Sequence, residues 1–171
     1  MKARYQKAFE EVWERANDAI KIATRNNWLL DIALDHLTLG RAHLGLALTS
    51  PVPDFTTAAR HLNEAVAGFR KAGHEWMTPS GLLARAAFYR VQSNVAAARA
   101  DLTEAEDIAT RGSMRLHLTD VHLEWTRLCL STGDHKAACE HLAKARALVD
   151  ATGYERRRRE IEWLSEQLAS T

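Results

Sequence analysis

A short motif recurs four times along this chain of 171 residues, and it constrains the fold more than any other feature. It consists of an alanine, a large aliphatic residue four positions later and a second alanine three positions after that. Its copies, which begin 42, 40 and 40 residues apart, are Ala16/Ile20/Ala23, Ala58/Leu62/Ala65, Ala98/Leu102/Ala105 and Ala138/Leu142/Ala145. This spacing places all three side chains on one helix face, where the alanines let a second helix approach closely and receive the aliphatic side chain. The near-constant period predicts an array of helical repeats.

Hydrophobic periodicity and turn residues predict an all-α fold of about eight antiparallel helices. Capping and helix-ending residues mark the boundaries: Asp54, Asn94, Ser113 and Asp134 are predicted N-caps, and Gly73, Gly112 and Gly153 are predicted helix ends. We therefore predict one domain over 1–171, made of a half repeat (1–27), helix pairs (28–73, 79–112 and 113–153) and a capping helix (154–171). The capping helix is expected to cover the last repeat with Ile161, Leu164 and Leu168.

Composition and charge argue against several classes of protein. The formal net charge is +1, so no global field attracts nucleic acid or an anionic membrane. Two cysteines are too few for a disulfide framework and fit a reducing compartment. The first seven residues lack the apolar core of a signal peptide, and no stretch reads as membrane-spanning. These features predict a cytoplasmic protein that binds neither nucleic acid nor membranes.

The period and the turns resemble those of tetratricopeptide (TPR) repeats in a longer, roughly 40-residue variety. The sequence Thr132-Gly133-Asp134 followed by Ala138 matches the turn of that family, and Ser93-Asn94 before Ala98 occupies the same turn without the glycine. The resemblance implies a right-handed α-α superhelix, a TPR-like solenoid. More narrowly, the stretches 28–46, 81–91 and 114–130 resemble the C-terminal repeat arrays of bacterial signalling NTPases of the STAND type, in which such an array senses or docks a partner.

The resemblance also implies a binding surface for a protein or peptide on the concave face, lined by the first helix of each pair. The positions that fall on this face are Leu37, Arg41, Leu44, Leu83, Ala87, Arg90, Leu123, Arg127 and Leu130. Three arginines in a groove would suit an acidic peptide, because guanidinium groups hold carboxylates through two hydrogen bonds. The alternative is that these arginines are solvated or pair with neighbouring acidic side chains.

Trp76 and Met77 form a second candidate contact site, because they lie in a predicted loop between two helices. Loops run over the surface, so large apolar side chains there need cover. One interpretation is that Trp76 folds back over the adjacent helix ends. The other is that it anchors a partner, since exposed tryptophan is a frequent interface hot spot.

No catalytic, cofactor-binding or metal-binding pattern emerges from the sequence. There is no glycine-rich phosphate loop, and pairs such as His36 and His43 lack the tight spacing of zinc ligands on a helix. We therefore predict a non-catalytic binding module without a cofactor. The alternatives are a specialised or engineered binder that uses the Trp76/Met77 loop, a regulator that closes around a signal peptide, and an enzyme with an unrecognised site.

Overall fold

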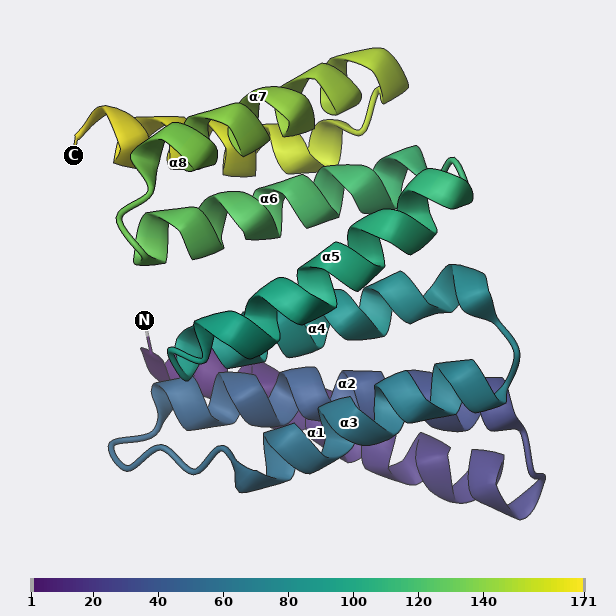
Figure 1. Cartoon of the computed structure of the whole chain (residues 1–171). Helices are drawn as coiled ribbons and strands as arrows, with labels where there is room; N and C mark the ends of the chain where they lie inside the picture. Colours follow the sequence, from purple (N-terminus) through teal and green to yellow (C-terminus); the bar gives the residue numbers. More distant parts are fainter. Residues whose placement is uncertain (1, 171) are drawn as a thin grey trace. The chain divides into compact units, whose positions relative to one another are not determined.

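The computed structural model describes residues 2–170, and that range contains eight α-helices, two short 3-10 helices and no strand (Figure 1). The elements in chain order are α1 (Lys2–Arg25), α2 (Leu29–Thr49), α3 (Thr56–Lys71), η1 (Glu75–Met77), α4 (Thr78–Val91), α5 (Val95–Arg111), α6 (Arg115–Ser131), α7 (His135–Thr152), η2 (Glu155–Arg157) and α8 (Arg158–Ala169). The prediction of an all-α protein with about eight helices is confirmed.

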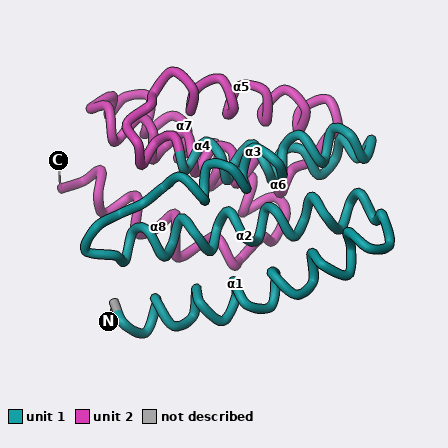
Figure 2. The backbone as a smooth tube through the Cα atoms, turned by 90° about the horizontal axis from the view of Figure 1, so that it is seen from below, with its two compact units in different colours: residues 1–88 teal, residues 89–171 magenta. Residues whose placement is uncertain are grey.

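The helices form two compact units, the first ending at Phe88 and the second beginning at Tyr89 (Figure 2). In unit 1, α2 packs against both α1 and α3, and α4 contacts α3 where Gly81 meets Phe69 and Val66. In unit 2, α5, α6, α7 and α8 pack in consecutive pairs, and α8 also contacts α6. Packing between successive helices is the arrangement expected of a helical repeat.

The repeated motif lies in the core, as its spacing predicts. Every motif alanine is buried, as are the three motif leucines, while Ile20 is half-buried. The close approach is clearest at Gly40 of α2, where an added Cβ would lie 2.7 Å from Leu62 Cγ. The helices approach similarly closely at Gly68 of α3, where an added Cβ would lie 2.8 Å from Ala33 Cβ. The motif leucine of α3 therefore fills the space that a glycine leaves on α2.

All turns between helices except the one from α2 to α3 contain a residue in the left-handed region of the backbone. From α3 onward these residues are 20 positions apart: Gly73, Ser93, Ser113, Gly133 and Gly153, with φ between 52° and 75°. The prediction that Ser113 caps α6 is therefore wrong, because Ser113 supplies the left-handed turn and α6 begins two residues later. Gly112 does end α5 as predicted, but with φ −83°, so the left-handed residue of this turn is Ser113.

Two of the predicted caps form as expected. The side chains of Asn94 and Asp134 accept hydrogen bonds from the N–H groups of Ala97 and Ala137, at 3.2 and 3.1 Å. Asp54 accepts from the N–H of Thr56 at 2.9 Å, just before α3 begins. These bonds satisfy donors that a helix start leaves open, so they fix where each helix begins.

The last helix packs as a cover on unit 2. Ile161 and Leu164 are buried in a cluster with Leu123, Leu142 and Val149, and Leu168 is half-buried against the same cluster. The remaining faces of α8 carry charged side chains and the exposed Trp163. The stripe predicted for the capping helix is the one that the structure buries.

Candidate functional site

A surface pocket of about 370 Å³ in unit 2 is the candidate site. Its lining comes from the last turn of α4, the end of α6, the start of α7 and one face of α8: Arg90, Arg127, Leu130, Ser131, His135, Trp163 and Gln167. The turn at Gly133 reverses the chain between α6 and α7, which brings the first residue of α7 beside the last turn of α6. Cationic, hydroxyl and amide groups thus share one pocket with an aliphatic and an aromatic side chain.

The two arginines of this pocket are held by one buried carboxylate. Glu124, whose side chain is only 7% exposed, accepts from Arg90 Nε at 2.7 Å and from Arg127 Nη1 at 2.9 Å. A buried carboxylate needs such partners, because an isolated charge would be strongly destabilising there. Glu124 therefore positions both guanidinium groups at the pocket wall.

The network continues from α6 to the last helix. Arg127 also pairs with Glu160 of α8, and Glu160 accepts from Arg157 at 3.0 Å. Arg157 in turn donates through Nε to Asp120 at 2.7 Å. Burial would lower the pKa of Arg157, but its hydrogen bond to Asp120 and the charge of that carboxylate produce a net rise. Three cations and three anions alternate along this chain of contacts, so the pocket is rich in hydrogen-bond donors without a large net charge.

The structure places the predicted groove residues in different environments. Arg90, Arg127 and Leu130 meet in the unit 2 pocket, whereas Arg41 lies in unit 1 and donates to the carbonyl of Ser80 at 3.4 Å. Leu37 and Leu123 are buried in the core and support the helices from within. The others, Leu44, Leu83 and Ala87, are half-buried in unit 1.

Two of the three groove arginines, Arg90 and Arg127, follow the alternative in which they pair with neighbouring acids. Arg127 uses Nη1 for Glu124 and Nη2 for Glu160. Arg90 uses only Nε for Glu124, and its two Nη groups make no further hydrogen bond within residues 2–170. Arg90 thus keeps its Nη donors available for a ligand.

Sequence reasoning missed the aromatic and imidazole parts of the pocket. Trp163 is 53% exposed, and His135 is exposed as the first residue of α7. A signal for Trp163 was present, because this tryptophan falls off the apolar stripe of α8 and must face away from the core. His135 carried no comparable signal, since its place in the pocket depends on the neighbouring helices.

The Trp76/Met77 segment forms the short helix η1 between α3 and α4. Trp76 remains 53% exposed, and its ring meets His74 edge-on with the centroids 6.0 Å apart. Met77 is half-buried. Trp76 is therefore not a buried core residue, and about half of it remains exposed on this segment.

Residues 2–170 contain neither a metal-binding cluster nor a membrane-spanning helix. No group of three histidine, cysteine or acidic side chains within this part of the chain is placed to hold a metal ion. Among the helices of residues 2–170, none combines the length and apolar character needed to cross a lipid bilayer. Comparison of the chain with protein families, with curated proteins and with solved structures gave no significant match.

Proposed function

We propose that this chain is a non-catalytic repeat module that binds a protein or peptide segment, and that the segment docks in the unit 2 pocket. The observation that carries the proposal is the pocket itself. It combines the Nη donors of Arg90 with the apolar surfaces of Leu130 and Trp163. Binding pockets typically combine apolar walls with a few fixed polar groups.

The lining favours a segment with a hydrogen-bond acceptor next to an apolar side chain. A carboxylate would use the two Nη groups of Arg90, because a guanidinium fork matches its two oxygens. The half-exposed indole of Trp163 would cover the neighbouring apolar side chain. Since Glu124 and Glu160 already neutralise much of the positive charge, the apolar contact is expected to contribute more affinity than charge alone.

The helical repeat leads to a broader proposal about the class and the role of this protein. We infer a TPR-like array with the right-handed superhelical winding of that family, acting in the bacterial cytoplasm as the sensing or docking part of a STAND-type signalling protein. The buried alanine-leucine motif and the regular turns support the repeat part of this proposal. The signalling role rests on the sequence resemblance.

A peptide array tests the docking proposal. Ten-residue peptides that vary independently in acidic and apolar content would be probed with the full chain, and the best peptide measured by fluorescence anisotropy. Trp163→Ala should weaken binding about 30-fold, the effect of losing roughly 2 kcal/mol at a hot spot. Arg90→Lys keeps the charge beside Glu124 but removes the fork, and should weaken binding about tenfold.

Trp28→Ala is the matched control, because Trp28 is 51% exposed and does not line the pocket. It should bind the peptide as the wild type does. Wild-type affinity in both the Trp163→Ala and Arg90→Lys variants would contradict docking in this pocket.

A second candidate surface is the η1 segment, favoured by the exposure of Trp76. Here a partner would cover the indole directly, without the arginine donors. Trp76→Ala in the same anisotropy assay separates the two surfaces. A loss of binding confined to Trp76→Ala would move the docking site to η1.

A further inference from the structure

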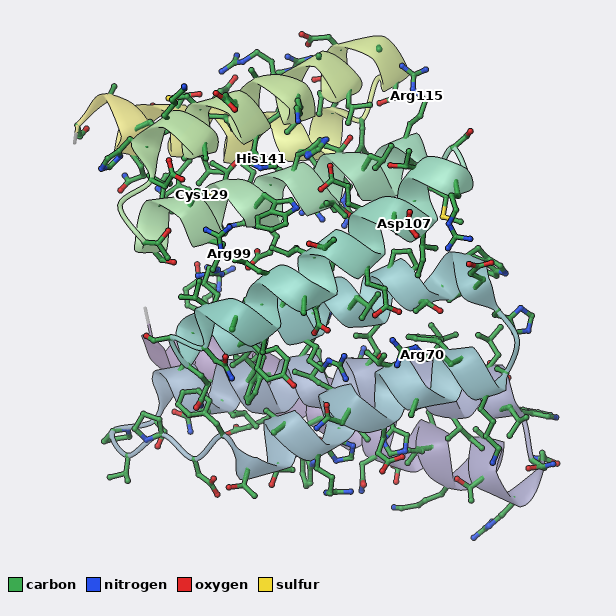
Figure 3. All side chains as sticks on the ribbon, viewed as in Figure 1. Arg70, Arg99, Asp107, Arg115, Cys129 and His141 are labelled. Atoms are coloured by element: carbon green, nitrogen blue, oxygen red, sulfur yellow. The ribbon has the colours of Figure 1, made fainter. Side chains whose placement is uncertain are left out.

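Two histidine pairs occupy corresponding places in the two units, each joining a helix to the next. His36 of α2 and His61 of α3 bring their Nδ1 atoms to 2.9 Å, and His122 of α6 and His141 of α7 bring theirs to 3.3 Å. In each pair the second ring also stacks on an aromatic side chain from the first helix: His43 covers His61, and Trp125 covers His141 (labelled on α7 in Figure 3). One ring must donate and the other accept in such a contact, so the accepting ring is neutral in this arrangement.

In unit 1 the neighbouring arginine determines which ring donates. Arg60 Nη2 lies 3.1 Å from His61 Nε2, and a guanidinium only donates. The Nε2 atom of His61 is therefore an acceptor, its proton lies on Nδ1, and Nδ1 donates to His36. A proton added at His61 Nε2 would displace Arg60, and one added at His36 Nδ1 would break the histidine pair. Protonation at either acceptor thus removes a contact of the joint between α2 and α3.

The surroundings of the unit 1 cluster also oppose protonation. Burial is the largest cause that lowers the pKa of His36, His43 and His61, and the charge of Arg60 adds to it at all three. The pKa of His61 falls to about 4. Glu64 acts in the opposite direction on His36 alone. Trp13 of α1 closes the cluster by meeting His43 edge-on, with centroids 6.4 Å apart.

The histidine pair of unit 2 serves as an internal comparison, because more carboxylates face it than face the unit 1 cluster. Burial lowers the pKa of His122 to about 4 and also lowers that of His141. Glu106 of α5 opposes this shift at both rings, Glu140 and Asp134 oppose it at His141, and Lys144 reinforces it. Arg99 of α5 lies over Trp125, 5.8 Å from the ring centroid. In the unit 1 cluster, three imidazole rings and one arginine face a single carboxylate. A positive charge that forms on these histidines is therefore compensated less well than one on the unit 2 pair.

We propose that the cluster of His36, His43 and His61 is an acid-sensitive joint, which opens the contact between α2 and α3 in mildly acidic solution before the corresponding contact in unit 2 opens. The direction of the pH dependence follows from proton binding. In the folded joint the pKa of each of the three histidines lies below its ordinary value. The same histidines in the opened state are therefore protonated first as the pH falls. The joint is therefore fully stable above about pH 6.5 and weakens as the pH drops towards 4.

Hydrogen–deuterium exchange of the full chain, resolved by peptide and corrected for intrinsic exchange rates, measures the opening directly. Each histidine that gains a proton only on opening raises the opening constant up to tenfold per pH unit. Between pH 6.5 and pH 5 we expect the opening constant of α2 and α3 to rise at least tenfold, and more than that of α6 and α7. An equal or smaller rise in unit 1 would overturn the proposal.

A double variant, His36→Asn with His61→Asn, tests whether the rings are responsible. The two amides can still pair across the helices but take up no proton, so the pH dependence of α2 and α3 should fall at least threefold whatever the stability at pH 7. Asp35 of α2, whose pKa is raised by burial and by Asp31, titrates in both proteins and cancels in the difference. His74→Asn, in the same unit but outside the cluster, is the control and should keep the wild-type profile.

If the double variant is too unstable to exchange measurably, histidine resonances of the wild-type protein replace it. Their titration should place the pKa of His36, His43 and His61 below the ordinary histidine value of 6.5. Retention of the wild-type pH dependence by the double variant, or ordinary titration of all three rings, would refute the acid-sensitive joint.

Discussion

The contact between Gly40 and Leu62 predicts that Gly40→Ala destabilises the wild-type protein but stabilises a Leu62→Ala variant. In Gly40→Ala the new methyl carbon would lie 2.7 Å from both Cγ and Cδ2 of Leu62 and 3.2 Å from its backbone nitrogen, where ordinary contacts begin at 3.4 Å. Leu62 is fully buried, so its side chain has no open space to move into. Relief therefore requires α2 and α3 to separate by about 0.7 Å, and overpacking of this kind costs about 1–3 kcal/mol.

Helix propensity acts in the opposite direction at this position. Replacing a mid-helix glycine by alanine gains about 1 kcal/mol, because glycine loses more backbone entropy on folding. The net effect of Gly40→Ala should therefore be a loss of up to about 2 kcal/mol in the free energy of unfolding. In a Leu62→Ala background the obstructing atoms are gone, so the same Gly40→Ala change should stabilise by about 1 kcal/mol.

Urea denaturation followed by circular dichroism measures all four proteins of this double-mutant cycle. Leu62→Ala alone should cost about 2–5 kcal/mol, as expected for a buried leucine. The interaction energy between the two sites should be about 1–3 kcal/mol, which is the overpacking cost that Leu62→Ala removes. A destabilising Gly40→Ala effect of the same size in both backgrounds would show that Leu62 is not the obstacle and would refute this packing.

The turns and the last helix give two further predictions. Ser93→Gly and Ser113→Gly should each raise the free energy of unfolding by about 1 kcal/mol, because both serines hold a left-handed backbone that glycine adopts without strain. Gly133→Ser should lower it by a similar amount. Unchanged melting temperatures in all three variants would contradict this account. Deleting 154–171 removes Ile161, Leu164 and Leu168 from the unit 2 cluster and should cost about 4 kcal/mol, so a shortened chain with the original melting temperature and solubility would rule out a covering role for α8.

Helix content and core residues could be predicted from the sequence because they depend on local spacing. The motif alanines and leucines share one helix face whatever the neighbours are, and Asn94 and Asp134 cap through bonds to residues three positions away. Ser113 misled the prediction because a serine before a helix suggests a cap, whereas its left-handed backbone is a property of the folded turn.

The candidate site was predicted only in part, for a related reason. Leu123 and Leu130 are seven residues apart on α6 and look equivalent in the sequence, yet Leu123 is buried in the cluster with α7 and α8 while Leu130 reaches the pocket. The partner of Arg127 at Glu124 is visible at a spacing of three, but its second partner, Glu160, lies on another helix. Which charges remain available to a ligand is thus decided by tertiary contacts.

The even 20-residue spacing of the left-handed turn residues has a consequence for how such a chain can change in length. Each step of 20 residues carries one helix and one turn, so inserting or deleting a single step reverses the direction in which every later helix runs. A change of two steps restores both the direction and the alternation of motif and partner helices. Duplications and grafts in blocks of 40 residues, cut at the left-handed positions, would therefore preserve every downstream interface, which makes these turns the natural joining points for recombining the array.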